Sequence, residues 1–363
     1  MIFNKRFLKD FDKALFLSVV VIILFGLLAV YSATQAKGLP FSKSFVLKQL
    51  TSLAVAAALF LIVVNIPYQK WIDAGSVFYG INVALLVLVL ILGHARLGAQ
   101  RWFSIGSFAF QPSEFIKINI ILVLAGYIGA KKDRMSGLRD LLVPIVLLGV
   151  PFALVLLQPD LGTALLLVPV FFAMLMIGGA KMRYIAGMAG LGFAALPFFW
   201  HFLRGYQKQR LLVFLDPNID PLGAGYTIIQ SKIAVGSGGL FGKGWLAGTQ
   251  NQLNFLPERH TDFIFSVVGE EWGFLGAAAL VLLYLLIVRR MFGIVSATTD
   301  IYGRLIATGV LTLLSLQVII NIGMTIGLMP VVGIPLPLVS YGGTSLIATL
   351  VAIGLVLNVG MRR

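Results

Sequence analysis

Four ionisable residues lie within five positions, directly before a long apolar run. The stretch LPERHTDFIFSVVGEEWG, residues 256–273, contains Glu258, Arg259, His260 and Asp262. From Phe263 the chain turns apolar, interrupted only by Glu270 and Glu271. Charged groups at the mouth of a membrane-length helix are costly unless they pair or carry out a function. Asp262 is the candidate general base, because cationic neighbours favour the ionised carboxylate that can accept a proton.

The composition predicts a helical membrane protein. Of the 363 residues, 59% are hydrophobic and 12% are charged, and apolar runs of membrane-spanning length recur along the chain. The net charge of +14 does not indicate a nucleic-acid partner, because no basic patch alternates with aromatic residues in a soluble module. Lys and Arg collect instead in cytoplasmic loops and headgroup zones. The absence of cysteine excludes disulfides and thiolate metal sites.

We predict an all-α polytopic protein that forms one integral membrane domain over residues 1–363. The first apolar run is too long for a signal peptide and is expected to span the membrane. Ten spans are expected, at residues 14–34, 45–66, 73–92, 113–130, 140–157, 161–179, 184–203, 263–288, 304–326 and 341–360.

The basic residues predict the orientation of these spans. With a cytoplasmic N-terminus, the inner segments hold Lys5, Arg6, Lys9, Lys13, Lys70, Lys131, Lys132, Arg134, Arg139, Lys181, Arg183, Arg289, Arg290, Arg304, Arg362 and Arg363. The short outer loops hold fewer, namely Lys37, Lys43, Lys48, Arg96 and Arg101. The positive-inside rule therefore places both termini in the cytoplasm, and the long loop of residues 204–262 outside.

This long outer loop is expected to be a functional element, because loops of about sixty residues are rare between spans. It is rich in glycine and contains the cations Arg204, Lys208, Arg210, Lys232 and Lys243. The segment TIIQSKIAVG, residues 227–236, is amphipathic enough to lie flat at the interface or to re-enter the bundle. A flexible, solvated loop is the alternative.

Further polar groups occur at the outer ends of spans. Glu114 and Lys117 are three residues apart, so they share a helix face and can pair, either in a wet cavity or as an ion pair that only fixes helix packing. Asp160 in QPDLGT is a helix N-cap or a cavity residue. The guanidinium of Arg101 suits a phosphate. Ser340 lies in PLPLVSYGGTS, where irregular backbone is expected to line a cavity.

Together these residues predict a cationic cavity with a few carboxylates on the outer side. Its members are Arg101, Glu114, Lys117, Asp160, Arg210, Lys232, Arg259, His260, Asp262 and Ser340. Such a site suits a substrate with a phosphate or diphosphate that approaches from the outer leaflet. Glycosyl transfer from a lipid diphosphate needs these parts, with Asp262 as base. A lipid or ion transporter fits the residues equally well. The three histidines are too scattered to predict a metal site.

Several long motifs in register resemble the SEDS family of bacterial cell-wall proteins, which comprises FtsW, RodA and SpoVE. They are LPERHTDFIFSVVGEEWG, DPLGAGYTIIQSKIAVGSGGLFGKGW, FQPSE, QPDLGT and PLPLVSYGGTS. The resemblance covers essentially the whole chain and implies a GT-C-like bundle of ten helices with a large fourth outer loop. The segments PERHTD and MPVVGIPLPLVSYGG favour members that act in cell elongation over those that act in division.

The resemblance implies a peptidoglycan glycosyltransferase that joins the disaccharide of lipid II to a glycan strand and releases undecaprenyl diphosphate. The essential aspartate of the family falls on Asp262, its polar pair on Glu114 and Lys117, and a further aspartate on Asp160. The implied partners are a class B penicillin-binding protein and other elongation-complex proteins. Mg²⁺ or Mn²⁺ at the diphosphate is a candidate cofactor. A lipid II flippase and a non-catalytic scaffold for a transpeptidase are the alternative functions.

Overall fold

The computed structural model describes residues 10–35, 45–96, 99–105, 108–131, 135, 137–203 and 205–363. Some of the basic residues named above lie outside these ranges. They are Lys5, Arg6, Lys9, Lys37, Lys43, Lys132 and Arg134, which were used to predict the orientation, and Arg204 of the long loop.

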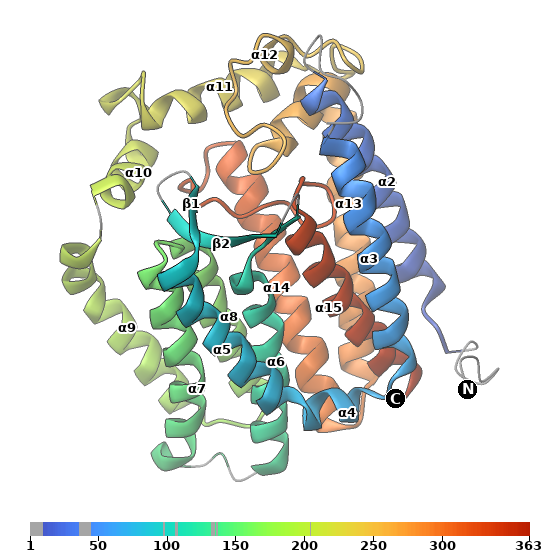
Figure 1. Ribbon diagram of the computed structural model, residues 1–363, viewed down its shortest axis with the longest axis vertical. Coiled ribbons are helices and arrows are strands. Elements are labelled where there is room, and N and C mark those ends of the chain that lie inside the picture. The colour runs from blue at the N-terminus through green and yellow to red at the C-terminus, as the bar shows by residue number, and fades with distance from the viewer. Residues whose placement is uncertain are drawn as a thin grey trace.

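Long apolar helices make up most of the molecule, as the composition predicts (Figure 1). They are α2 (Lys13–Thr34), α3 (Phe45–Asn65), α5 (Gly75–Leu92), α6 (Pro112–Lys131), α7 (Leu138–Leu157), α8 (Leu161–Ile177), α9 (Met182–Phe202), α13 (Ile264–Ala297), α14 (Ile301–Thr325) and α15 (Gly343–Met361), with the short α4 (Tyr68–Asp73) between α3 and α5. In the described ranges, nine helices are long and apolar enough to cross a membrane. Helix α8 has only 17 residues, so the count of ten spans stays a prediction.

The helix that contains one predicted span continues past the predicted end of that span. Helix α13 continues to Ala297, well beyond the predicted end at residue 288, so Arg289 and Arg290 are helical. Arg290 Nη2 lies 2.8 Å from Asp12 Oδ2, which joins α13 to the start of α2.

Helix α15 forms the centre of the bundle. It packs along α3 and α14, and α14 packs in turn along α6 and α8. In α15, 89% of the span is buried inside the protein, whereas in α9 the buried share is 6%. A helix that is apolar on all sides belongs either in the core or against lipid. Helix α15 is of the first kind and helix α9 is of the second.

A small antiparallel sheet, which the sequence analysis did not predict, lies between α5 and α6. Its strands are β1 (His94–Arg96), β2 (Ala99–Ile105) and β3 (Phe108–Phe110), in that order. Figure 1 shows β1 and β2 near the upper end of the bundle. Thr344 Oγ1 donates a hydrogen bond to the carbonyl of Ala109 at 2.9 Å, which ties the sheet to the start of α15. Strands this short produce a weak sequence pattern, which explains why they were missed.

The long loop is largely helical instead of flexible. It forms α10 (Gly205–Leu215), the 3₁₀ helix η2 (Pro217–Ile219), α11 (Ala224–Ser237) and α12 (Thr249–Gln252). Helices α10, α11 and α12 lie along the upper part of the molecule (Figure 1). The amphipathic segment of residues 227–236 falls inside α11, and its position relative to the membrane stays a prediction.

The glycines of this loop are required where it packs against a break in α13. Gly273 has a φ of 65°, which interrupts the helix and frees carbonyl groups. The backbone N–H groups of Lys243 and Gly244 donate to the carbonyls of Glu270 and Glu271, each at 3.0 Å. At Gly238, a Cβ atom would lie 1.9 Å from a carbonyl oxygen of α13, so only glycine fits.

We expect Gly238→Ala to destabilise the protein by about 1–3 kcal/mol, because the new methyl group forces α11 away from α13. Gly236→Ala is the matched control, since a Cβ there meets nothing within 4 Å. Thermal unfolding of the purified protein in detergent compares the two. Equal melting temperatures would contradict the close packing at Gly238.

Candidate functional site

The site is organised around the irregular segment between α14 and α15, which we call the 326–342 loop. Pro330, Pro335 and Pro337 prevent a continuous helix here. Gly327 and Gly333 have φ values of 77° and 75°, in the left-handed region that favours glycine. The predicted break before the last span is therefore confirmed.

Asp262 lies directly against this loop. Its Oδ2 atom is 3.4 Å from the position that a Cβ of Gly333 would take, so the carboxylate lies in van der Waals contact with this part of the loop. The Oγ of Ser340 donates to the carbonyl of Thr261 at 2.6 Å, and the N–H of Tyr341 donates to the carbonyl of His260 at 2.8 Å. The segment before α13 is thus bonded to the loop, and Ser340 acts here through the backbone.

Burial, modified by the surrounding charges, makes Asp262 a proton acceptor close to neutral pH. Burial raises the pKa of Asp262 to about 6, and the negative charge of Glu258 adds to the rise. The positive charges of Arg210 and Arg101 oppose this rise, so both guanidinium groups act on the carboxylate. Asp160 raises the pKa slightly further. The aspartate is therefore ionised at pH 7 and still basic enough to take up a proton.

The carboxylate of Asp262 differs from the other carboxylates in the upper part of the bundle. Glu114, Asp160 and Glu270 each form an ion pair with a basic side chain. The side chain of Asp262 has no hydrogen bond or ion pair within the described part of the chain. A carboxylate held by a partner has a structural role, whereas one without a partner is free to accept a proton from a substrate.

Two exposed cations of the long loop reach the same 326–342 loop. Arg210 of α10 donates from Nη1 to the carbonyl of Val331 at 3.3 Å, and its guanidinium lies over the ring of Tyr206. Lys232 of α11 extends over Gly327, with Cε 3.0 Å from the position of a Cβ there. Both side chains are exposed, so their charges remain available to an anion.

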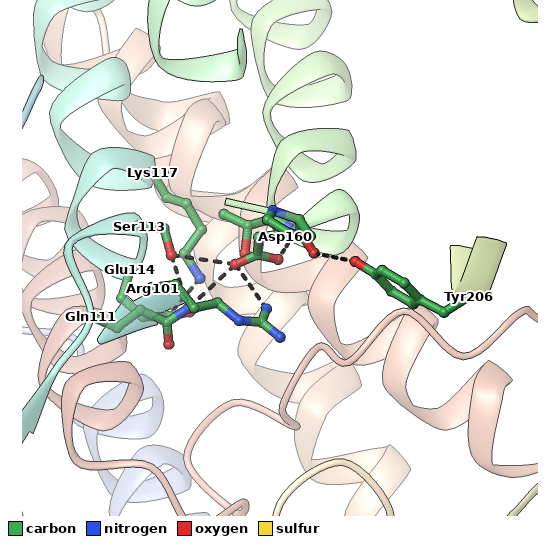
Figure 2. Close-up of polar contacts among 9 residues, drawn as sticks. Arg101, Gln111, Ser113, Glu114, Lys117, Asp160 and Tyr206 are labelled. Atoms are coloured by element: carbon green, nitrogen blue, oxygen red, sulfur yellow. Dashed lines mark hydrogen bonds and ion pairs between the residues drawn. The ribbon is translucent and has the colours of Figure 1, made fainter. Parts of the chain in front are cut away.

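Asp160 is the centre of a polar cluster at the start of α8 (Figure 2). Its Oδ2 atom lies 3.3 Å from Arg101 Nη1 and accepts from Gln111 Nε2 at 3.3 Å and Ser113 Oγ at 3.4 Å. Its Oδ1 atom accepts from the N–H of Thr163 at 3.1 Å, so the predicted N-cap is confirmed. The side chain of Arg101 is 25% exposed, and the cluster holds it at the edge of the site.

Glu114 and Lys117 form the predicted ion pair, with Lys117 Nζ 2.8 Å from Glu114 Oε2 (Figure 2). Both side chains are buried, and they line a narrow cavity between α6, α14 and α15 together with Gln317 and Thr349. The cavity has room for about one water molecule. The pair thus faces the bundle interior, in keeping with both of its predicted roles.

The structure does not bring Arg259 and His260 into this set of cations. Arg259 Nε donates to the carbonyl of Ala33 at 2.7 Å, at the end of α2. The ring of His260 packs against Phe45 and Tyr341, with centroids 4.7 and 5.6 Å apart. Burial lowers the pKa of His260, so its ring is neutral at pH 7. Both side chains serve to anchor the segment that carries Asp262.

Sequence reasoning missed the roles of several polar residues. Glu270 Oε1 accepts from Lys243 Nζ at 2.8 Å, and Glu271 accepts from the hydroxyl of Ser32 at 2.6 Å. These bonds hold the glycine-rich segment and do not involve Asp262. Asn321 was also missed, although a polar side chain inside an apolar span is itself a signal.

Within the described ranges, no group of three or more His, Asp or Glu side chains could hold a metal ion. A cation on a diphosphate needs fewer protein ligands, because Mg²⁺ binds through one or two carboxylates together with phosphate oxygens. Asp262 is the carboxylate that fits this requirement, since its oxygens have no hydrogen-bond or ion-pair partner among the described residues. Mg²⁺ or Mn²⁺ with the diphosphate therefore stays a prediction.

The fold and the site define a multi-pass helical membrane protein in which an unpaired carboxylate and exposed cations meet at one loop. The family model described as a cell cycle protein, FtsW/RodA/SpoVE, matches residues 12–363, and the chain belongs to this family.

Comparison with individual proteins supports a RodA-like assignment within the family. The chain is 41% identical to the peptidoglycan glycosyltransferase MrdB of Escherichia coli K12, over 99% of this chain and 97% of the relative. It is 32% identical to the solved structure of the rod shape determining protein RodA of Thermus thermophilus, with a TM-score of 0.73 over 97% of each chain. A structure described as a peptidoglycan synthase complex that coordinates polymerization and crosslinking gives a TM-score of 0.82 at 35% identity, over 97% of this chain and 98% of that chain.

The buried pair predicts a strong coupling between Glu114 and Lys117. Lys117→Met is expected to destabilise the protein by about 3–5 kcal/mol, because it leaves a buried carboxylate without a partner. Adding Glu114→Gln should restore most of this loss. Lys131→Met, at the opposite end of α6, removes a more exposed partner of Asp140 and should cost about 0–1 kcal/mol. Thermal unfolding in detergent measures all three variants, and additive losses in the double variant would contradict the coupling.

Proposed function

We propose that this protein is a peptidoglycan glycosyltransferase that polymerises lipid II into glycan strands during cell elongation, with Asp262 as the general base. The observation that carries the proposal is the unpaired carboxylate of Asp262, which lies on the same loop that Arg210 and Lys232 contact. Membership of the FtsW/RodA/SpoVE family and the names of the relatives support the same activity.

In the proposed reaction, the carboxylate of Asp262 takes the proton from an acceptor sugar hydroxyl. The oxygen attacks the anomeric carbon of the donor disaccharide and forms the β-1,4 bond. The bond from the anomeric carbon to the diphosphate breaks, and its electron pair leaves with undecaprenyl diphosphate. Positive charge lowers the barrier, because the leaving group becomes more negative as the bond breaks.

The cations of the site suit the leaving diphosphate. Arg210 and Lys232 are exposed beside the loop, and Arg101 is partly exposed at its edge. The charges of Arg210 and Arg101 also lower the pKa of Asp262, which helps to keep it ionised. Both substrates are tethered to lipid and confined to one leaflet, so proximity contributes to the rate.

The proposal includes a location and a partner. The protein would lie in the bacterial cytoplasmic membrane with both termini inside the cell and the site on the outer face, as the basic residues predict. A class B penicillin-binding protein would supply the transpeptidase, and other elongation-complex proteins would join it. Similarity to a structure described as a peptidoglycan synthase complex supports such a partner.

A lipid II flippase receives less support than a transferase. A flippase needs a polar path through both leaflets. In the described part of the chain, the buried charged residues besides Asp262 are Glu114, Lys117, Asp160, Glu270 and Glu271, which all lie near the helix ends that carry the site. In the other half of the described bundle the buried polar side chains are uncharged, among them Thr308 and Asn358, so a charged headgroup would find no charged partner there.

Asp262→Asn is expected to abolish lipid II polymerisation, because the amide has nearly the same shape but cannot accept the proton. A loss of at least 100-fold is expected for a general base. The measurement is polymerisation of lipid II by the full-length protein with its transpeptidase partner, with glycan products resolved on a gel. Asp216→Asn is the matched control, since this exposed aspartate lies in the same long loop and only accepts from the N–H of Asn218, a bond that an amide oxygen can also accept.

Three outcomes separate the alternatives. Equal polymer from wild type and Asp262→Asn would remove Asp262 as the base. Absence of polymer from wild type would favour the scaffold or the flippase. If Asp262 instead holds a divalent cation, chelation with EDTA would stop the wild-type reaction, and added Mg²⁺ or Mn²⁺ would restore it.

The rate should also depend on pH through Asp262. Because the base must be ionised and burial raises its pKa to about 6, activity should be high at pH 7 and fall as pH drops through 6. Glu258→Gln removes a negative charge that raises this pKa, so the acid limb should move to lower pH. Polymerisation rates between pH 4.5 and 8 test this, and an unmoved limb would contradict the influence of Glu258.

A further inference from the structure

Asn321 is a fully buried amide in the last turns of α14. Its Nδ2 atom donates one hydrogen bond to the backbone carbonyl of Asp262 at 2.9 Å and a second to the carbonyl of Ile334 at 2.8 Å. These two carbonyls belong to different segments, one directly before α13 and the other within the 326–342 loop. One side chain on a regular helix therefore joins the segment of the proposed base to the loop that the base faces.

The position of the Asp262 carboxylate depends on this connection. The segment before α13 is irregular, with Glu258 at a φ of 48°, and the backbone of Asp262 forms no hydrogen bond to another backbone group in the described part of the chain. Ser340 holds the neighbouring carbonyl of Thr261, and Asn321 holds the carbonyl of Asp262 itself. Gly333, which the carboxylate approaches, is the residue next to Ile334.

No other side chain of similar size can replace this amide fully. Its NH₂ group offers two donors, and both are used here. Leucine has none, an ionised aspartate only accepts, and threonine has one donor. Replacement thus releases one or both carbonyls, and the two segments lose the contact that sets their separation.

We infer that Asn321 is a positioning residue of the transferase, which acts by fixing the backbone of Asp262 relative to the 326–342 loop. The inference rests on the proposed role of Asp262 as the base. Arg210 contacts this loop at Val331 and Lys232 contacts it at Gly327, so the same connection sets where the base lies relative to these cations. A displacement of about 1 Å in such a constellation can cost about 100-fold in rate.

The test compares Asn321→Leu with wild type in lipid II polymerisation by the full-length protein and its transpeptidase partner. The expected result is a kcat about 100-fold lower with a nearly unchanged KM, because the diphosphate cations remain in place. The acid limb of the pH profile should also move to lower pH, since water reaches a less constrained Asp262 carboxylate and reverses part of the effect of burial. Asn321→Thr keeps one donor, so its kcat should lie between those of wild type and Asn321→Leu. This variant replaces Asn321→Leu in the test if the leucine variant does not fold.

Thr325→Val is the matched control, because Thr325 is equally buried one turn further along α14 and its hydroxyl bonds only within its own helix. It should leave kcat and the pH profile unchanged.

The outcomes distinguish this inference from the proposed function. A wild type without polymer, or an active Asp262→Asn, would overturn the role of Asp262 itself. With that role intact, wild-type kcat and pH profile in Asn321→Leu and Asn321→Thr would overturn the positioning role. A loss that only follows the amount of folded protein, with an unmoved acid limb, would also overturn it, because it would show a purely structural contribution.

Discussion

The site depends on irregular backbone that a membrane protein must satisfy with its own hydrogen-bonding groups. Between α14 and α15 the chain leaves the helix, and its peptide groups need partners where lipid offers none. Gln49 Nε2 donates to the carbonyl of Ser340 at 3.2 Å, Ser340 Oγ accepts from the N–H of Leu336 at 2.8 Å, and Asn321 binds Ile334. These bonds make the 326–342 loop a fixed surface, on which Asp262 and two exposed cations meet.

The distribution of ion pairs separates structural carboxylates from the proposed base. Glu114, Asp160 and Glu270 have basic partners, which offset the cost of removing their charges from water. Loss of one of these basic partners would leave a buried carboxylate without compensation and would affect folding first. Asp262 has no such partner among the described residues, and its pKa near 6 reflects burial and the nearby Glu258. This combination costs stability, and natural proteins accept such a cost mainly at functional sites.

Glycine has two distinct uses in the molecule. At Gly333 it allows the positive φ of the loop backbone beside Asp262, and at Gly238 it lets the long loop touch a broken helix. The break in α13 at Gly273 exposes carbonyl groups that the glycine-rich segment then satisfies. The upper part of the bundle is thereby held by backbone contacts, which bring residues of the long loop and of the last two helices into one site.

The sequence by itself determined the membrane fold, the positions of most spans and the residue types of the site. Hydropathy is a local property, and the pairing of Glu114 with Lys117 follows from helical spacing alone. The family followed from long motifs in register. Only the tertiary structure decided which polar residues meet, because Asn321 and Asp262 are 59 positions apart and no periodicity relates them. It also removed Arg259 and His260 from the set of anion-binding candidates, since their neighbours Ala33 and Phe45 lie more than two hundred positions away in the chain. Contacts of this kind depend on how helices pack, and helix packing is decided by the whole chain.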